Sequence, residues 1–263
     1  MKYLFLHEMK RSGKNLLIWL LCVGGLCFSC IMLFTTMEES MADMADQFSQ
    51  MGAFSDAFGM SSLSIATLEG FYATEVGTIF GLGGAMFAAL LGSCVLSKEE
   101  DGHTGEFLYT LPVSRSKAII VKGLSLISNI LIFNIGCVAL YLLGFVILGE
   151  EIDLQRFFLY HGMQLLMQCE VGGICFLLSA GSKRNRMGIG LGIALLLYVL
   201  DLMARVIPKI EDLKVITPFS YANASDIFST GDVEQVALVI GIILLVTTFT
   251  AGHYVYGHRD LAA

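Results

Sequence analysis

Long apolar runs are the feature of this sequence that most limits how the chain can fold. An α-helix needs about 20 apolar residues to cross the hydrocarbon core of a membrane. Runs of about this length occur at residues 16–34, 76–96, 123–148, 157–180, 187–207 and 236–256. No alternation of apolar and polar residues typical of a lipid-facing strand competes with them, and a chain in lipid must form helices or a closed barrel. The sequence therefore predicts an all-α polytopic membrane protein with six transmembrane helices.

The composition agrees with a membrane protein. Of the 263 residues, 56% are hydrophobic and 15% are charged, whereas about 25% are charged in soluble globular proteins. The seven cysteines fall within apolar runs and lack the spacing of a metal site or of a secreted disulfide framework. We expect a single transmembrane domain covering residues 1–263.

Basic residues in the connecting segments predict the orientation, because Lys and Arg are enriched in cytoplasmic loops. Six spans place both termini on one side, and that side carries all but four of the 16 Lys and Arg residues. The exceptions are Arg156, Arg205, Lys209 and Lys214. Both termini are therefore expected in the cytoplasm of a multi-pass protein of the cell membrane, and we expect a prokaryotic plasma membrane.

Two segments outside the spans are amphipathic. Residues 1–14 combine apolar and basic positions, which predicts an interfacial helix that turns into the first span at Gly13. Residues 35–75 form an outer segment with seven acidic and no basic residues. Its stripe at helical spacing consists of Met37, Met41, Met44, Phe48 and Met51. That stripe indicates either a helix packed on its neighbours or an adaptable apolar surface at the outer side that binds an amphipathic substrate or a partner helix.

Motifs of catalysis are missing from the sequence. There is no GxxxxGK[ST] phosphate-binding loop, no HExxH and no GxSxG. The histidines are scattered, without a second ligand at helical spacing. We therefore expect no catalytic residues, no metal site, no cofactor bound by this chain and no nucleic-acid partner, so the chain is not an enzyme by itself.

Ionisable groups within apolar spans are candidates for function because they are costly in lipid. Glu170 lies near the middle of the fourth span, close in sequence to Gln164 and Gln168. These three side chains could line a substrate pathway, or Glu170 could be a protonated, hydrogen-bonded packing group. Asp201 is expected to form an ion pair with Arg205 at i,i+4 spacing.

Two glycines also favour close helix packing. Gly188 and Gly192 form a small-xxx-small pattern at the start of the fifth span.

The segment 97–122 concentrates charge between the second and third spans. It begins SKEEDGHTGEF and has the composition of a helix that ends near Pro112. Phe107, Leu108 and Leu111 share one face of this helix at i, i+1 and i+4. An apolar helix face on the cytoplasmic side indicates a helix that docks on another protein, or else a helix packed back on the bilayer surface.

This segment resembles the cytoplasmic loop between the second and third spans of permease subunits of ABC transporters of the type-2 exporter class. The matching positions are Glu99, Glu100, Gly102, Thr104, Glu106, Leu108, Pro112, Ser114, Arg115 and Lys122. The chain departs from the pattern at His103 and Gly105. Residues 216–228 (ITPFSYANASDIF) and 258–261 (HRDL) are similar to later segments of the same family, in the same order.

The resemblance implies a membrane subunit that works with a separate cytoplasmic ABC ATPase, which would bind ATP and Mg. In the family this loop carries a coupling helix that docks on the ATPase. The residues this assigns to coupling are Glu99, Glu100, Gly102, Thr104, Glu106, Phe107, Leu108, Leu111, Pro112 and Arg115. The resemblance further implies pairing with a second copy or a related permease, surrounded by membrane lipids.

Three functions remain open from the sequence. The favoured one is the transmembrane subunit of an ATP-driven exporter for a hydrophobic or amphipathic substrate such as a lipid, peptide or drug. The second is a proton-coupled secondary transporter that uses Glu170. The third is a non-transporting membrane scaffold.

Overall fold

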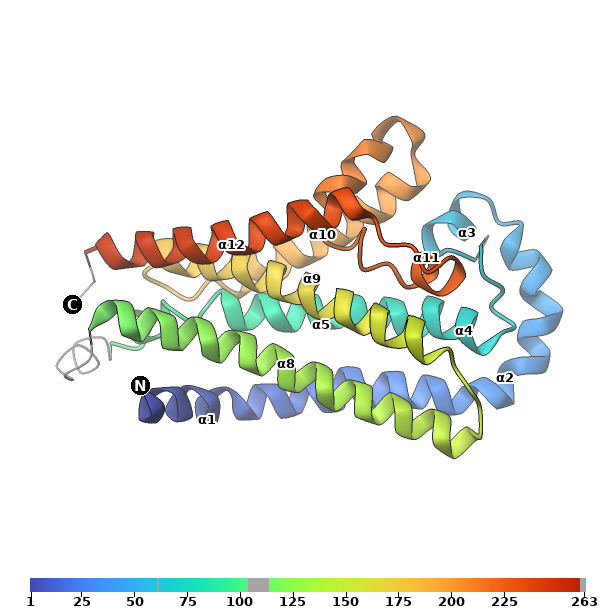
Figure 1. Cartoon of the computed structure of the whole chain (residues 1–263), viewed down its shortest axis with the longest axis horizontal. Helices are drawn as coiled ribbons and strands as arrows, with labels where there is room; N and C mark the ends of the chain where they lie inside the picture. Colours follow the sequence, from blue (N-terminus) through green and yellow to red (C-terminus); the bar gives the residue numbers. More distant parts are fainter. Residues whose placement is uncertain (61, 104–113, 261–263) are drawn as a thin grey trace.

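Long helices run side by side in one bundle, and both ends of the chain lie at the same end of it (Figure 1). This computed structural model describes residues 1–60, 62–103 and 114–260. Within these residues, six helices are long and apolar enough to cross a membrane. The predicted all-α polytopic fold is confirmed.

The bounds of the helices follow the predicted spans closely but not everywhere. The long helices are α1–α2 (Lys2–Trp19 and Gly25–Ser49, joined by the π-helical turn Leu20–Gly24), α5 (Gly77–Gly92), α8 (Arg115–Leu148), α9 (Leu154–Gly181), α10 (Met187–Val206) and α12 (Gln235–His258). The short ones are α3 (Ala53–Phe58), α4 (Leu68–Phe71, followed by the π-helical turn Tyr72–Val76), α6 (Lys98–Asp101), the 3-10 helix Pro208–Ile216 and α11 (Ala224–Ser229).

The predicted turn at Gly13 does not form. Helix α1 passes through Gly13 and continues into the first apolar run, so residues 2–14 are the first turns of a long helix. A glycine inside a helix costs about 1 kcal/mol relative to alanine. Here the neighbouring turns are held by side-chain contacts from Glu8 and Ser12, which outweigh that small cost.

The third long helix begins earlier than the predicted residue 123. The Ser114 side chain accepts a hydrogen bond from the backbone nitrogen of Lys117, at 3.4 Å, and caps the start of α8. Arg115, Lys117 and Lys122 therefore belong to α8 rather than to a loop. The second long helix ends at Gly92, short of the predicted residue 96.

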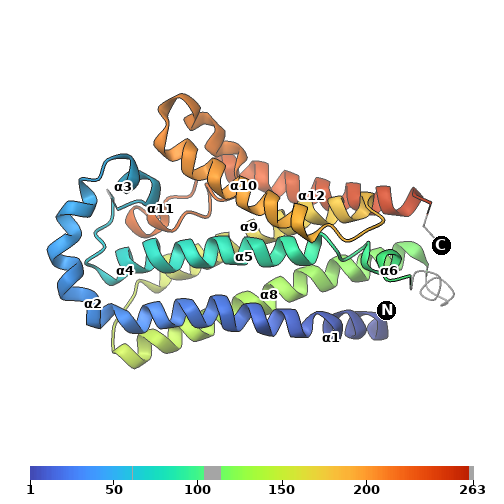
Figure 2. The ribbon, with the colours of Figure 1, turned by 180° about the vertical axis from the view of Figure 1, so that it is seen from behind.

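Helices α5 and α9 form the buried centre of the bundle. Figure 2 shows α5 between α1 and α10, with α6 at the end that holds both chain termini. Gly92 of α5 lies so close to α9 that a β carbon there would sit 2.5 Å from the carbonyl oxygen of Gly172. For Gly188 and Gly192, such a carbon would have no neighbouring atom of the described residues within 4 Å, so the close packing expected of them does not occur within the described part of the chain.

The opposite end of the bundle holds an aromatic core. The Tyr72 ring contacts side chains from several elements: Tyr141, Phe145, Phe157, Tyr160, His161 and Phe228. The later part of α2 turns away from the bundle axis at this end and leads to α3 (Figure 1). Of the methionine stripe, Met37 and Met51 are exposed and Met41 packs against the core. The side chains of Met44 and Phe48 lie outside the described residues.

Candidate functional site

The predicted coupling residues fall partly within the described structure. Glu99 and Glu100 lie in α6, Gly102 follows it, and Arg115 begins α8. The positions outside the described residues are Thr104, Glu106, Phe107, Leu108, Leu111 and Pro112. Docking through the apolar face formed by Phe107, Leu108 and Leu111 therefore stays a prediction. The part of the site that the structure describes is the base of this loop, residues 97–103.

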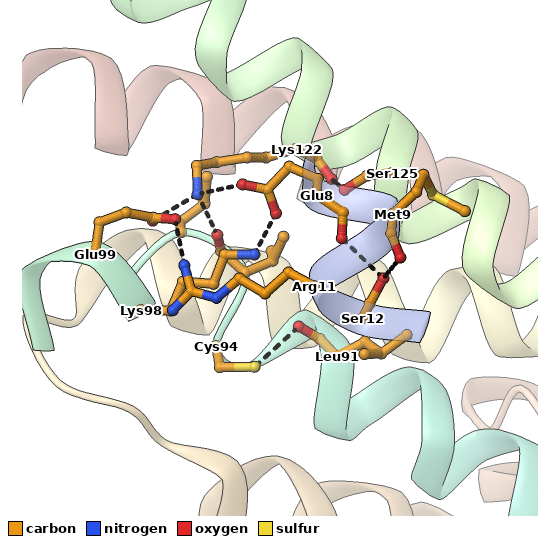
Figure 3. Close-up of polar contacts among 12 residues, drawn as sticks. Glu8, Met9, Arg11, Ser12, Leu91, Cys94, Lys98, Glu99, Lys122 and Ser125 are labelled. Atoms are coloured by element: carbon orange, nitrogen blue, oxygen red, sulfur yellow. Dashed lines mark hydrogen bonds and ion pairs between the residues drawn. The ribbon is translucent and has the colours of Figure 1, made fainter. Parts of the chain in front are cut away.

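A buried charge network ties α6 to α1 and α8. The network consists of Glu8, Arg11, Lys98, Glu99 and Lys122. The Glu8 carboxylate contacts the ammonium groups of Lys98 and Lys122, the second at 3.4 Å. Glu99 accepts from Lys122 at 2.5 Å and from Arg11 at 3.4 Å. Figure 3 shows the two lysines converging on Glu8, with Arg11 reaching across to Glu99.

The network is buried where its carboxylates meet Lys122. The exposed fraction is 3% for Glu8, 5% for Glu99 and 0% for Lys122. Lys122 also donates to the backbone oxygen of Val95 at 2.9 Å, which holds the chain just ahead of α6. Buried charges are tolerated only when they are paired and hydrogen-bonded. Separating α1, α6 and α8 would leave these charges unpaired, so the three elements are expected to move together.

Hydrogen bonds extend the connection to α9. The backbone nitrogens of Leu96 and Ser97 both donate to the Ser179 hydroxyl, at 3.0 and 3.1 Å. Ser179 lies near the end of α9 and is fully buried. The segment between α5 and α6 is therefore fastened to the central helix α9.

A second group of contacts, the C-terminal clamp, joins α6 and α8 to the end of α12. The clamp consists of Glu100, Arg115, Tyr256 and Arg259. The Arg259 guanidinium contacts the Glu100 carboxylate, and Arg115 donates to the Arg259 backbone oxygen at 2.5 Å. Both guanidiniums lie over the Tyr256 ring, at 5.3 and 5.1 Å from its centroid. Such cation–π contacts add to the ion pair.

Together these contacts make the base of the loop a junction of α1, α8, α9 and α12. A displacement of residues 97–103 would be passed to four long helices at once, because each helix has its own hydrogen bond or ion pair to this segment. Sequence reasoning singled out Glu99, Glu100 and Arg115 but not Glu8, which pairs with Lys98 and Lys122 in the same junction. The available signal was that Glu8 is the only acidic residue in the basic segment 1–14.

Comparison with known protein families matches residues 3–261 to the ABC-2 family of transporter proteins. The match spans nearly the whole chain. The chain belongs to the ABC-2 transporter family. It is accordingly a multi-pass membrane protein and a transmembrane subunit of a transporter. Membrane subunits of this family in general associate with an ABC ATPase. None of the curated proteins compared with it matches.

In this ABC-2 transporter the polar residues predicted to line a substrate pathway are all buried. Glu170 accepts a hydrogen bond from the Tyr221 hydroxyl at 2.8 Å. Gln168 accepts from the Asn134 amide at 2.7 Å, and Gln164 donates to the Ala222 backbone oxygen at 2.8 Å. Glu170 and Gln164 thus bind the neighbouring residues Tyr221 and Ala222, whereas Gln168 binds Asn134 of α8.

One of these residues lines a small cavity near the end of the bundle that holds α11. Gln164 shares this cavity of about 50 Å³ with Thr78, Tyr198, Asp201 and Asn223, among other residues. A role of Gln164, Gln168 and Glu170 in the substrate pathway therefore stays a prediction.

The predicted ion pair of α10 is confirmed. Arg205 donates to Asp201 at 2.8 Å and also contacts Asp226 of α11 at 3.1 Å. The Thr217 hydroxyl donates to the other oxygen of Asp201 at 2.7 Å. These contacts fix the segment between α10 and α12 and give Asp201 a structural explanation. Among the described residues, no three His, Cys, Asp or Glu side chains are grouped so as to hold a metal ion.

Proposed function

We propose that this chain is the transmembrane subunit of an ATP-driven exporter and that residues 97–122 couple it to a separate cytoplasmic ATPase. The observation that carries the proposal is the junction at the base of this loop. Glu99 and Glu100 are buried and paired with side chains of α1, α8 and the end of α12. A loop that only joined two spans would have no need of buried charges shared with three other helices.

ATP and Mg are bound by the partner ATPase in this proposal, and two permease copies, or one copy and a related permease, complete the pathway. Closure of the ATPase pushes on the loop, and the junction passes the movement to α1, α8, α9 and α12. A ligand or partner shifts a conformational equilibrium only through contacts that differ between the two states. The contacts between the loop and the ATPase are the ones we expect to differ, while the charge network and the C-terminal clamp stay formed and pass the movement on.

The proposed substrate is hydrophobic or amphipathic, such as a lipid, peptide or drug. Support comes from the apolar interior and from the exposed methionines Met37 and Met51 of the outer segment, since methionine adapts to varied apolar surfaces. Export rather than import rests on the type-2 resemblance of the loop.

The test is co-purification with the ATPase expressed from the same operon or gene neighbourhood. We expect the double variant Leu108→Asp, Leu111→Asp to lose bound ATPase and ATP hydrolysis by the complex while the chain still reaches the membrane. The matched control is Leu154→Asp, Ile216→Asp, at exposed apolar positions of the opposite end of the bundle. Full ATPase binding and hydrolysis in the Leu108, Leu111 variant would show that this face does not dock the ATPase.

A further inference from the structure

A polar crevice opens beside the charge network, at the end of the bundle that holds both termini. Its volume is about 240 Å³ and it lies between α1, the end of α5, α8 and the loop before α10. Arg11, Ser12 and Lys98 contribute polar groups to it, and Asn185 contributes another from the loop side. Figure 3 shows Arg11, Ser12, Lys98 and Cys94, which are among its lining residues.

The crevice has two kinds of wall. Besides its polar residues it is lined by Leu91, Val95, Leu126 and Met187, which are apolar. Met187 begins α10 and is exposed at the edge of the bundle. A site lined by both charged and apolar groups matches a phospholipid, whose head group is charged and whose chains are not.

The charge of the crevice favours an anion. Of the charged residues that line it, Arg11 and Lys98 are cations and Glu8 is a carboxylate, so the lining carries a net positive charge. The Arg11 side chain is 46% exposed and contacts Glu99 at 3.4 Å. A guanidinium has five N–H donors, so Arg11 can keep Glu99 and still bind a phosphate.

The loop that contributes Asn185 adds further positive charge. Lys183, Arg184 and Arg186 flank Asn185 and are exposed. Basic pockets between membrane helices on the cytoplasmic side are sites for anionic lipid head groups. We propose that this crevice binds the phosphate head group of an anionic phospholipid, with Arg11 as the main contact. The proposal does not depend on coupling to an ATPase.

The chain carries its own reporter for this binding. Its single tryptophan, Trp19, lies on α1 about two turns beyond Arg11, towards the apolar part of the bundle. Bromine atoms on the acyl chains of a bound lipid quench tryptophan fluorescence at short range. Full-length protein is therefore reconstituted in vesicles of unbrominated phosphatidylcholine that contain a minor, equal fraction of either brominated phosphatidylglycerol or brominated phosphatidylcholine, and the quenching of Trp19 is compared.

We expect phosphatidylglycerol to bind about fivefold more tightly than phosphatidylcholine, since one basic residue near anionic lipid contributes about that factor. Arg11→Gln is expected to remove the preference. Lys14→Gln is the matched control, because Lys14 is an exposed cation on the same helix that does not line the crevice. Retention of the preference in Lys14→Gln supports the crevice over general surface charge.

A second variant keeps the test valid if Arg11→Gln disturbs the charge network. Asn185→Asp has nearly the same shape and can still accept the 3.1 Å hydrogen bond from the Met187 nitrogen, but it adds a negative charge at the crevice. We expect it to weaken phosphatidylglycerol binding without lowering Tm. Equal quenching by the two lipids in the unaltered protein, or equal losses in Arg11→Gln and Lys14→Gln, would overturn the proposal.

A free phosphate has the same chemistry as the head group and is distinguished separately. The melting temperature of detergent-solubilised protein is measured in inorganic phosphate and in chloride at matched ionic strength. Stabilisation by phosphate that vanishes in Arg11→Gln, combined with no lipid preference in the vesicles, would assign the crevice to a soluble anion and overturn the lipid proposal.

Discussion

At the scale of single residues, Glu8 is the most important structural residue that the sequence analysis did not identify. Its carboxylate is buried and contacts two lysines from different elements. Lys98 follows α5 by a short connection, whereas Lys122 lies inside α8. One carboxylate therefore holds three segments that are far apart in the chain, and its neutralisation leaves two lysines short of a partner.

We predict that Glu8→Gln destabilises the protein by about 3 kcal/mol, because removing one partner of a buried ion pair leaves uncompensated charge. The measurement is the thermal unfolding of the purified chain in detergent. Glu151→Gln, at an exposed position of the turn between α8 and α9, is the matched control and should change stability by less than about 0.5 kcal/mol. Equal melting temperatures for the two variants would show that the network does not stabilise the fold.

Glu170 is the residue on which the choice between two transport mechanisms depends. The Tyr221 hydroxyl donates to its carboxylate, and a glutamine oxygen can accept the same hydrogen bond. We predict that Glu170→Gln leaves ATP-driven activity of the reconstituted complex nearly unchanged.

Tyr221→Phe is the companion variant, since it leaves a buried acceptor unsatisfied at a cost of about 1–3 kcal/mol. It should lower Tm while Glu170→Gln does not. Loss of activity in a well-folded Glu170→Gln protein would mean that a charge is required there, and would revive the proton-coupled mechanism.

At the scale of helices, close approach of α5 and α9 defines the centre of the bundle. The contact at Gly92 is largely with backbone: a β carbon there would lie 2.5 Å from the Gly172 oxygen and 3.2 Å from the Phe176 nitrogen. Backbone cannot move aside as a flexible side chain can. The sequence pattern of Gly188 and Gly192 predicted such close packing for α10. Whether a glycine packs closely depends on which atoms of a neighbouring helix lie opposite it, and the pattern does not contain that information.

We predict that Gly92→Ala lowers Tm by several degrees, because α5 must move away from α9 to admit the methyl group. Gly162→Ala in α9 is the control, since nothing lies within 4 Å of its added carbon. There alanine should be neutral or slightly stabilising, as it favours helix by about 1 kcal/mol over glycine. A Gly92→Ala protein as stable as the unaltered chain would contradict the close contact.

At the scale of the whole molecule, the even number of long helices brings both ends of the chain together. The N-terminal helix, α6 and the end of α12 meet at this end of the bundle, and the charge network and the C-terminal clamp are built there (Figure 2). The excess of Lys and Arg on this side predicts that it faces the cytoplasm.

Reporter fusions test this orientation. Alkaline phosphatase, which is active only outside the cytoplasm, is fused to chains truncated after residue 152 or after residue 183. We predict activity for the first and none for the second, whereas a fluorescent protein with the opposite requirement should report only from residue 183. The reverse pattern would place the junction on the outer side and exclude a cytoplasmic ATPase as its partner.

The sequence by itself determined how many helices are long and apolar enough to cross a membrane, that the fold is all-α and which side is expected to face the cytoplasm. These properties depend on local composition, because about 20 successive apolar residues are enough to make a span. It also identified the pair Asp201 and Arg205, which lie one helical turn apart. The resemblance of the loop to ABC-2 permeases came from local motifs in the same way.

Only the tertiary structure decided which helices form the centre and which charges meet. Glu8 pairs with Lys98, and Glu100 pairs with Arg259, although long stretches of chain separate the partners. Gly13 looked like a turn, yet α1 passes straight through it. The physical reason is that the cost of a buried charge or a helical glycine depends on the neighbours supplied by other helices, and no local pattern contains those neighbours.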